Sequence, residues 1–309
     1  MTAESQFIDE IARIFSASQG GVEVGIGDDC ALIAGSPRQL ATIDAQVEHV
    51  HFERVWIDGE TLGARLFLVN LSDITACAGS PRHALFSAAF GSADREYVLA
   101  VARGLAREAA LHSCAIAGGN VSNGALQLHL ALLGALAGDR MIERSGAKSG
   151  DLVYVTGTVG DAAAGLELLR AGTLDGALVQ RWRRPPNRTS LAAAMGKHAS
   201  AAIDVSDGLA QDLGHIAVRS KLTIQIEAAQ LPLSEALRAH AGLRATALAL
   251  QGGEDYEIAM TCPPEHALDL ESAAKRLGIG LTRIGACASG LPRVSVQGYD
   301  GPLQGHAHL

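Results

Sequence analysis

The stretch Ile203-Asp204-Val205-Ser206-Asp207-Gly208-Leu209 joins a short apolar run to a segment with helical periodicity. An apolar run that stops at acidic and small residues just before such a segment is typical of a strand followed by a helix. Ser206 or Asp207 can cap this helix, but a cap does not account equally well for Asp204 and the nearby Asp212. The stretch therefore predicts layered α/β structure with carboxylates gathered at the junction.

Strand-like and helix-like segments continue on both sides of this junction. In the second half we expect helices at residues 161–171, 188–198, 208–219 and 265–277, and strands at 152–156, 222–226, 257–261 and 293–296. In the first half we expect helices at 57–78 and 97–111, strands at 40–44, 84–90, 114–117 and 126–136, and short β-like runs within 22–34. The pattern predicts a mixed α/β (α+β) protein with two domains, residues 1–145 and 146–309, and a loosely held tail after Gly298.

Composition narrows the class of protein. The chain has 309 residues, of which 48% are hydrophobic and 19% charged, which favours a well-buried globular protein. A formal net charge of −8 argues against nucleic acid as a partner. The five cysteines are scattered without a CxxC pair, which favours a reducing compartment. We find neither a signal peptide nor a membrane-length apolar stretch, so we expect a cytosolic protein with no membrane partner.

Acidic residues in the first half stand at strand ends, at turns and within an apolar helix. They are Asp28 and Asp29 after Gly27, Asp44 at the end of a β-like run, and Asp73 inside the apolar segment at 57–78. Each alone can be a turn, a cap or an ion pair, for instance of Asp73 with Arg65 or Arg82. Burying Asp73 requires a cation or a hydrogen-bond network, and hard oxygen ligands select Mg²⁺. Together the four predict a magnesium site.

Two glycine-rich segments and one histidine pair are further candidates. Gly118-Gly119-Asn120 follows a predicted strand, where backbone N–H groups could approach a phosphate, although an ordinary tight turn is favoured for this segment taken alone. In Gly252-Gly253-Glu254-Asp255-Tyr256-Glu257 the glycines allow close approach and the acids could bind metal or substrate, while a charged turn before a strand explains the segment about as well. His49 and His51 share one face of a possible strand, and without a third soft ligand a substrate contact is favoured over zinc.

Taken in order, these blocks resemble the thiamine-monophosphate kinase family. The resemblance rests on several motifs: Gly27-Asp28-Asp29-Cys30-Ala31, Asp44, Val47-Glu48-His49-Val50-His51-Phe52, Asn70-Leu71-Ser72-Asp73-Ile74, Gly79-Ser80-Pro81, Gly118-Gly119, Arg144-Ser145-Gly146-Ala147, Gly150-Asp151, Thr156-Gly157-Thr158-Val159-Gly160-Asp161, residues 203–209 and residues 252–257. The chain lacks a G-x-x-x-x-G-K-[ST] loop, the protein-kinase motif set, a G-x-S-x-G elbow and a dinucleotide fingerprint. A different scaffold for phosphate chemistry is thus expected.

The resemblance implies a fold and a reaction. The superfamily also contains aminoimidazole ribonucleotide synthetase and selenophosphate synthetase, with two α/β domains and N-terminal domains that pair into a dimeric β-barrel. It implies an N-terminal domain, residues 1–145, that binds ATP and magnesium, and a C-terminal α/β domain, residues 146–309. The implied activity is ATP- and Mg²⁺-dependent phosphorylation of thiamine monophosphate by a homodimer.

The resemblance also implies roles for single residues. Metal ligands would be Asp28, Asp29, Asp44, Asp73, Asp204 and Asp207. Residues along the nucleotide would be Gly118, Gly119, Asn120, Arg144 and Ser206. Residues facing the acceptor would be His51, Phe52, Asp255 and Tyr256, and the catalytic set would be Asp73, Asp207 and Arg144.

Two positions depart from the family pattern and keep other interpretations open. The family usually has Gly-Gly-Asp-Thr where this chain has Gly118-Gly119-Asn120-Val121, and glycine where it has His49. The alternatives are a same-scaffold kinase for another phosphorylated cofactor precursor, an ATP-dependent synthetase or cyclase, and a nucleotide-binding dimer without activity.

Overall fold

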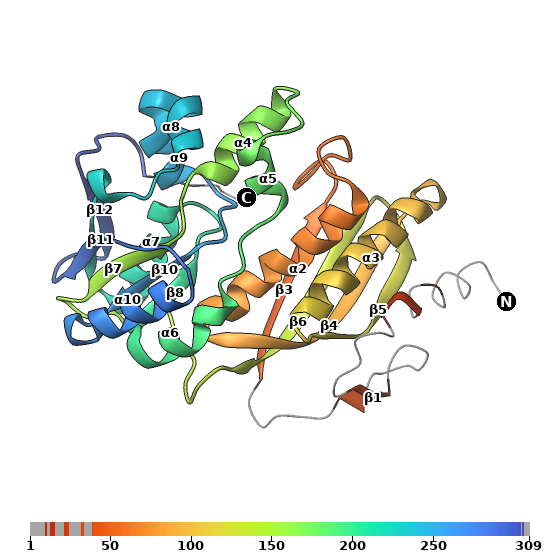
Figure 1. Cartoon of the computed structure of the whole chain (residues 1–309), viewed down its shortest axis with the longest axis horizontal. Helices are drawn as coiled ribbons and strands as arrows, with labels where there is room; N and C mark the ends of the chain where they lie inside the picture. Colours follow the sequence, from red (N-terminus) through yellow and green to blue (C-terminus); the bar gives the residue numbers. More distant parts are fainter. Residues whose placement is uncertain are drawn as a thin grey trace. The chain divides into compact units, whose positions relative to one another are not determined.

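The structure is a computed structural model that describes residues 10, 13–15, 22–24, 32–33, 39–303 and 305. The chain forms two compact units (Figure 1). The first comprises Met1–Ile74 and Ser80–Ala135, and the second comprises Thr75–Gly79 and Leu136–Leu309. Among the described residues, no helix is both long and apolar enough to cross a membrane.

The first unit is built on a four-stranded sheet in the order β3-β6-β4-β5, with β1 and β2 pairing separately. Up to Leu136 the elements are β1 (Val22–Val24), β2 (Leu32–Ile33), β3 (Leu40–Val47), α2 (Gly59–Ala76), β4 (Gly79–Phe90), η1 (Ser92–Asp94), α3 (Arg95–Leu111), β5 (Ala115–Asn123) and β6 (Gln127–Leu136). β3 and β6 are antiparallel, whereas β4 and β5 are parallel. The two strands at the edges are therefore β3 and β5.

Helices α2 and α3 cover one face of this sheet (Figure 1). The Asp58 carboxylate caps α2 by accepting from the Thr61 N–H at 2.9 Å. The two helices cross closely because Gly63 and Gly104 lack side chains; a Cβ at either position would overlap the backbone of the other helix. This tight crossing fixes the face of α2 that meets β3.

The second unit is built on a six-stranded sheet in the order β12-β9-β11-β7-β10-β8. Its elements are β7 (Leu152–Thr156), α4 (Asp161–Arg170), α5 (Ala177–Arg183), η2 (Thr189–Leu191), α6 (Ala192–His198), β8 (Ala201–Asp204), α7 (Leu209–Ser220), β9 (Thr223–Glu227), η3 (Ala228–Gln230), α8 (Glu235–Ala241), η4 (Gly242–Arg244), α9 (Ala245–Gln251), β10 (Ile258–Cys262), η5 (Pro264–His266), α10 (Ala267–Arg276), β11 (Leu281–Ala288) and β12 (Arg293–Gln297). Within the described residues, β12 and β9 are parallel, and the other neighbouring strands of this sheet are antiparallel.

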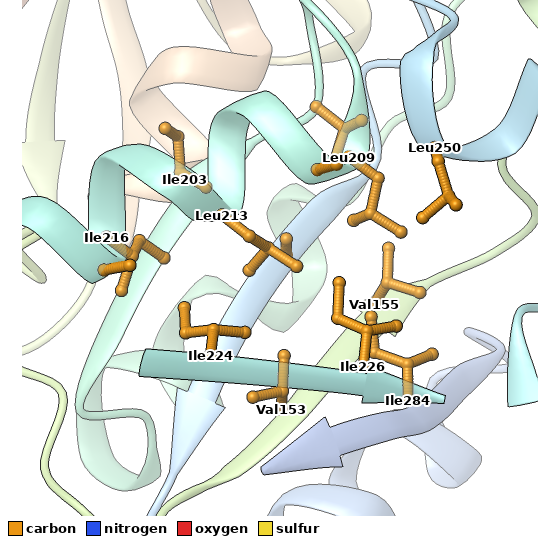
Figure 2. Close-up of a cluster of buried hydrophobic side chains, with 14 of the residues drawn as sticks. Val153, Val155, Ile203, Leu209, Leu213, Ile216, Ile224, Ile226, Leu250 and Ile284 are labelled. Carbon is orange, nitrogen blue, oxygen red and sulfur yellow. The ribbon is translucent and has the colours of Figure 1, made fainter. Parts of the chain in front are cut away.

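Alternating strand residues supply a separate core on each face of this sheet. One core contains Val153, Val155 and Ile203 with Leu209, Leu213 and Ile216 of α7 (Figure 2). The other contains Tyr154, Ala202 and Met260 with residues of α6 and α10. Helix α7 therefore lies on one face of the sheet, and α6 and α10 lie on the opposite face.

The mixed α/β fold class predicted from the sequence is confirmed, whereas several local predictions are wrong. Gly118-Gly119-Asn120 was expected after a strand and instead lies within β5. β11, which pairs with β7 and β9, was not predicted at all. The segment after Gly298 is not loosely held up to Gly305: Tyr299 and Leu303 pack on the α7 core, and the Gly305 N–H donates to Gln211 at 3.0 Å.

Candidate functional site

In the first unit, polar residues of β3 and α2 meet on the helix-covered face of the sheet. The Thr42 hydroxyl donates to the Asp73 carboxylate at 2.7 Å, and the Asp44 N–H donates to the Asn70 side-chain oxygen at 3.0 Å. Asn70 is buried, and Asp44 and Asp73 are half-buried. Two predicted metal ligands are therefore brought together on a rigid strand and helix.

The local sequence explains this convergence. Thr42 and Asp44 are two residues apart in β3 and so share one face, while Asn70 and Asp73 are three residues apart in α2 and lie on one side of the helix. The Asn70 amide also donates to the Leu66 carbonyl at 2.9 Å, which fixes its orientation. Asp28 and Asp29, the other predicted ligands of this half, lie outside the described residues.

The glycine segment of β5 is not next to these carboxylates within the first unit. β3 and β5 are opposite edges of the sheet, separated by β6 and β4, which corresponds to about 14 Å. A Cβ at Gly119 would overlap the Phe86 carbonyl of β4, so only glycine fits there. Asn120 beside it is exposed.

The turn after β3 holds His51 in a defined orientation. The Val47 N–H donates to the His51 Nδ1 at 3.1 Å, so a neutral His51 carries its proton on Nε2. His49 has a φ of 67° and pairs with Glu53 at 2.9 Å. Phe52, predicted to face the acceptor, is instead 1% exposed and belongs to the core.

In the second unit, the motifs at residues 203–209 and 252–257 lie side by side. The Glu254 N–H donates to the Ser206 carbonyl at 2.7 Å, and the Tyr256 N–H donates to the Val205 carbonyl at 2.7 Å. A Cβ at Gly253 would lie 2.5 Å from the Ser206 oxygen, which explains the glycine. Glu254 and Tyr256 both have positive φ, a strain typical of functional loops.

Asp212 organises the first of these loops. One of its carboxylate oxygens accepts from the N–H groups of Ser206, Asp207 and Gly208, each at 3.1 Å. Burial and the nearby Asp207 raise the pKa of Asp212 to about 7, although the three N–H groups act against that rise. Ligand atoms of Asp207, Asp212 and His215 lie within 4.8 Å of one another. A divalent cation there would relieve the repulsion between the two carboxylates.

Asp255 and Glu257 are buried and fix the surrounding backbone. Asp255 is wholly buried and accepts from the N–H groups of Gly160 and Ala162, at 2.5 and 3.1 Å, at the start of α4. Burial raises its pKa to about 7. Glu257 accepts two hydrogen bonds from Arg188, at 2.7 and 2.8 Å, and one from Arg181. Asp255, predicted to face the acceptor, is thus enclosed, whereas Tyr256 is half-buried.

Arg144 and Asp204 take different positions from Asp207. The Arg144 carbonyl accepts from Ser220 at the end of α7, whereas Asp207 precedes the start of that helix. α7 has 12 residues and is about 18 Å long, so the second unit does not place Arg144 beside Asp207. Asp204 ends β8 and is 4% exposed, beneath the loop that carries Asp207.

Sequence reasoning passed over several uncharged or distant members of these groups. Thr42 and Asn70 could have been found from their spacing, two residues before Asp44 and three before Asp73, on the same faces. Arg181 was given no role, and Glu257 was considered only as part of a charged turn. Arg181 and Glu257 pair with each other although they are far apart in the sequence, so no local pattern indicates the contact.

Comparisons with known proteins cover nearly the whole chain. Residues 27–136 match the AIR synthase related protein, N-terminal domain, and residues 148–291 match the AIR synthase related protein, C-terminal domain. The thiamine-monophosphate kinase of Haemophilus influenzae is 36% identical over 288 residues, which cover 90% of this chain and 88% of that protein.

Two solved structures extend the comparison. The crystal structure of thiamine-monophosphate kinase from Stenotrophomonas maltophilia has a TM-score of 0.87 and 35% identity, covering 96% of this chain and 97% of that one. A structure of AaThiL complexed with AMPPCP and TMP has a TM-score of 0.78 and 31% identity, covering 100% of this chain and 99% of that one.

Proposed function

The chain belongs to the thiamine-monophosphate kinase family of AIR synthase related proteins, and on that premise we propose that it phosphorylates thiamine monophosphate to thiamine diphosphate with ATP. The observation that carries the proposal is similarity along almost the whole chain to kinases of that name. AaThiL, which was solved with AMPPCP and TMP, matches the full length of this chain.

Chemically, the reaction is a direct transfer. An oxygen of the acceptor phosphate forms a bond to the γ-phosphorus of ATP while the bond from that phosphorus to the β-phosphate oxygen breaks, and ADP leaves. The acceptor oxygen is already anionic, so no strong general base is required. Holding the two anions in line and neutralising their charge supplies the catalysis.

Mg²⁺ is the cation that these carboxylates fit, and when bound it would neutralise the phosphate charge. The fit rests on two features: burial and the nearby Asp207 together raise the pKa of Asp212, and Asp44 and Asp73 present hard oxygen ligands on a strand and a helix. We assign metal binding to both groups, with Asp28 and Asp29 as the further ligands that the family pattern implies.

The remaining roles follow the family pattern. Gly118, Gly119, Asn120, Arg144 and Ser206 are assigned to the nucleotide. His51 is assigned to the acceptor, as the family pattern implies, and the Val47 N–H fixes the orientation of its ring. Tyr256 joins it, while Phe52 and Asp255 support the site from within.

A homodimer is favoured by the sheet of the first unit. Helices cover the face that carries the buried Leu128, Leu130 and Leu132. The residues that alternate with these along β6, and their partners on β3, include Ile43, which is 65% exposed, and the half-buried Ala131 and Leu133. An apolar sheet face of this kind is typical of a surface that a second copy covers. The cytosolic location stays a prediction.

The decisive test is mass analysis of the products from ATP, Mg²⁺ and thiamine monophosphate. We expect thiamine diphosphate and ADP in equal amounts. Release of inorganic phosphate without a phosphorylated product would point to a synthetase or cyclase, and tight ATP binding without turnover would point to a nucleotide-binding dimer.

A different acceptor is the second candidate, because His49 adds an exposed imidazole close to His51 where the family usually has glycine. A panel of phosphomonoesters assayed for ADP release separates the two. Preference for thiamine monophosphate supports the first proposal, whereas a higher kcat/KM for another ester assigns the site to that ester.

A further inference from the structure

Three potential metal ligands meet on the face of the second unit that lies opposite α7. His198 is the last residue of α6, His266 the last residue of η5, and Asp269 lies in the first turn of α10. One ligand atom from each lies within 4.8 Å of the other two. The two imidazole rings are 5.6 Å apart between centroids and inclined by 54°, so they do not stack face to face.

The His198 ring has a nitrogen without a partner. Its Nδ1 is buried and makes no hydrogen bond, one of three such side-chain atoms within the part of the chain that the structure describes. Leaving a buried polar atom unpaired costs about 1–3 kcal/mol. The other two atoms belong to Ser72 and Arg181, so His198 alone of the three combines this feature with a metal-ligating side chain.

The ligand chemistry selects a borderline transition ion over Mg²⁺. Two imidazoles and one carboxylate are a set that Zn²⁺ accepts, with bonds of about 2.0–2.2 Å. Around a tetrahedral ion such bonds place ligand atoms about 3.4 Å apart. To bring the ligand atoms to this spacing, the side chains of Asp269, which is exposed, and His266, which is half-buried, would move closer to His198. Mg²⁺ prefers oxygen ligands and octahedral geometry.

The surroundings hold the histidine backbones in place. The Cys262 thiol at the end of β10 contacts the His198 carbonyl at 3.3 Å, and Leu270 of α10 shares a core with Met195 of α6. An ion at this position would therefore tie α6 to the segment between β10 and α10. The group of Asp207, Asp212 and His215 lies on the opposite face of the sheet, at the start of α7.

We propose that His198, His266 and Asp269 form a binding site for a zinc-class divalent ion, separate from the magnesium-dependent phosphoryl-transfer site. Three protein ligands leave one coordination position of a tetrahedral ion to water.

Co²⁺ titration of the metal-stripped full-length protein, with excess Mg²⁺ present, tests the proposal. We expect one Co²⁺ per chain with the visible absorption of a tetrahedral site, displaced by an equivalent of Zn²⁺. His266→Gln is expected to weaken binding at least about a hundredfold, and Asp269→Asn at least about tenfold. Zn²⁺ should also raise the Tm of the parent protein and not that of His266→Gln.

Two matched variants complete the design. His240→Gln changes an exposed histidine of α8 that pairs with Glu167, and it should leave Co²⁺ affinity unchanged. His215→Gln changes the histidine near Asp207 and should also leave it unchanged. Equal Co²⁺ affinity in the parent and His266→Gln, or loss of binding in His215→Gln instead, would overturn the proposal. Circular dichroism of the metal-free variants shows whether each is folded.

Discussion

The two acidic groups of this protein are held in different ways. In the first unit, Asp44 and Asp73 stand on a strand and a helix, and side chains of Thr42 and Asn70 contact them. In the second unit, Asp207 stands on a loop, and that loop is shaped by backbone N–H groups that converge on Asp212.

The difference separates two tasks of a carboxylate. Asp73 sits on elements that fold without it, so its loss should affect chemistry more than stability. Asp212 is 2% exposed and organises the backbone that positions Asp207, so its loss should affect stability first. Loss of Asp207 should affect both chemistry and stability, because Asp207 is a proposed metal ligand and also repels Asp212.

Asp73→Asn should give the largest effect. Removal of a metal ligand worth several kcal/mol lowers kcat by about 100- to 1000-fold, because each 1.36 kcal/mol is a factor of ten. Urea unfolding should show a free energy of unfolding close to that of the parent. Steady-state ADP release measures the first effect, and full activity in the variant would remove Asp73 from the site.

Asp212→Ala should lower the free energy of unfolding by about 3 kcal/mol, because it leaves three backbone N–H groups without their acceptor. Denaturant unfolding measures the loss. Asp212→Asn is the matched control, since its side-chain oxygen can still accept and it carries no charge; it should lose much less. If both variants lose the same amount, the loop is not held by these hydrogen bonds.

The pKa of Asp212 predicts a pH-dependent response to Mg²⁺. Its folded pKa is about 7, against 3.8 as its ordinary value, so stability falls as pH rises from about 4 to 7 while only the unfolded chain loses this proton. Mg²⁺ favours the ionised form and offsets that loss. Thermal unfolding should show a larger Mg²⁺-induced rise in Tm at pH 8 than at pH 5.

Asp207→Asn provides the control for this pH dependence. It removes the like charge beside Asp212 and one proposed metal ligand, so the difference between the two pH values should shrink. An equal Mg²⁺ response of the parent protein at both pH values would contradict the role of Asp212.

Thr42→Val should give the smallest effect, a fall in kcat of roughly tenfold, because one hydrogen bond from a hydroxyl to the charged Asp73 carboxylate contributes about 1.5 kcal/mol. The measurement is kcat at saturating Mg²⁺, with Thr42→Ser as the control that retains the hydroxyl. A loss as large as that of Asp73→Asn would mean that Thr42 itself touches the reacting groups.

Local sequence patterns predicted the elements that carry the site. They failed where contacts between residues far apart in the sequence determine the structure. The apolar run of α2 could be identified because it is a local pattern. β11 was missed because Thr282, Arg283 and Gly285 break the alternation; a Cβ at Gly285 would overlap the β9 backbone, a reason visible only after folding. The separation of Arg144 from Asp207 is likewise a property of α7's length and direction.

The end of the described chain bears on how this protein can be engineered. The Gly305 N–H donates to Gln211, whose amide reaches Asp207 at 3.3 Å, and Tyr299 and Leu303 anchor the same segment. A fluorescent reporter or affinity handle fused just after residue 298 would cut this support. Such a fusion is expected to weaken the proposed metal site, so handles placed in this segment require a comparison with the unmodified enzyme.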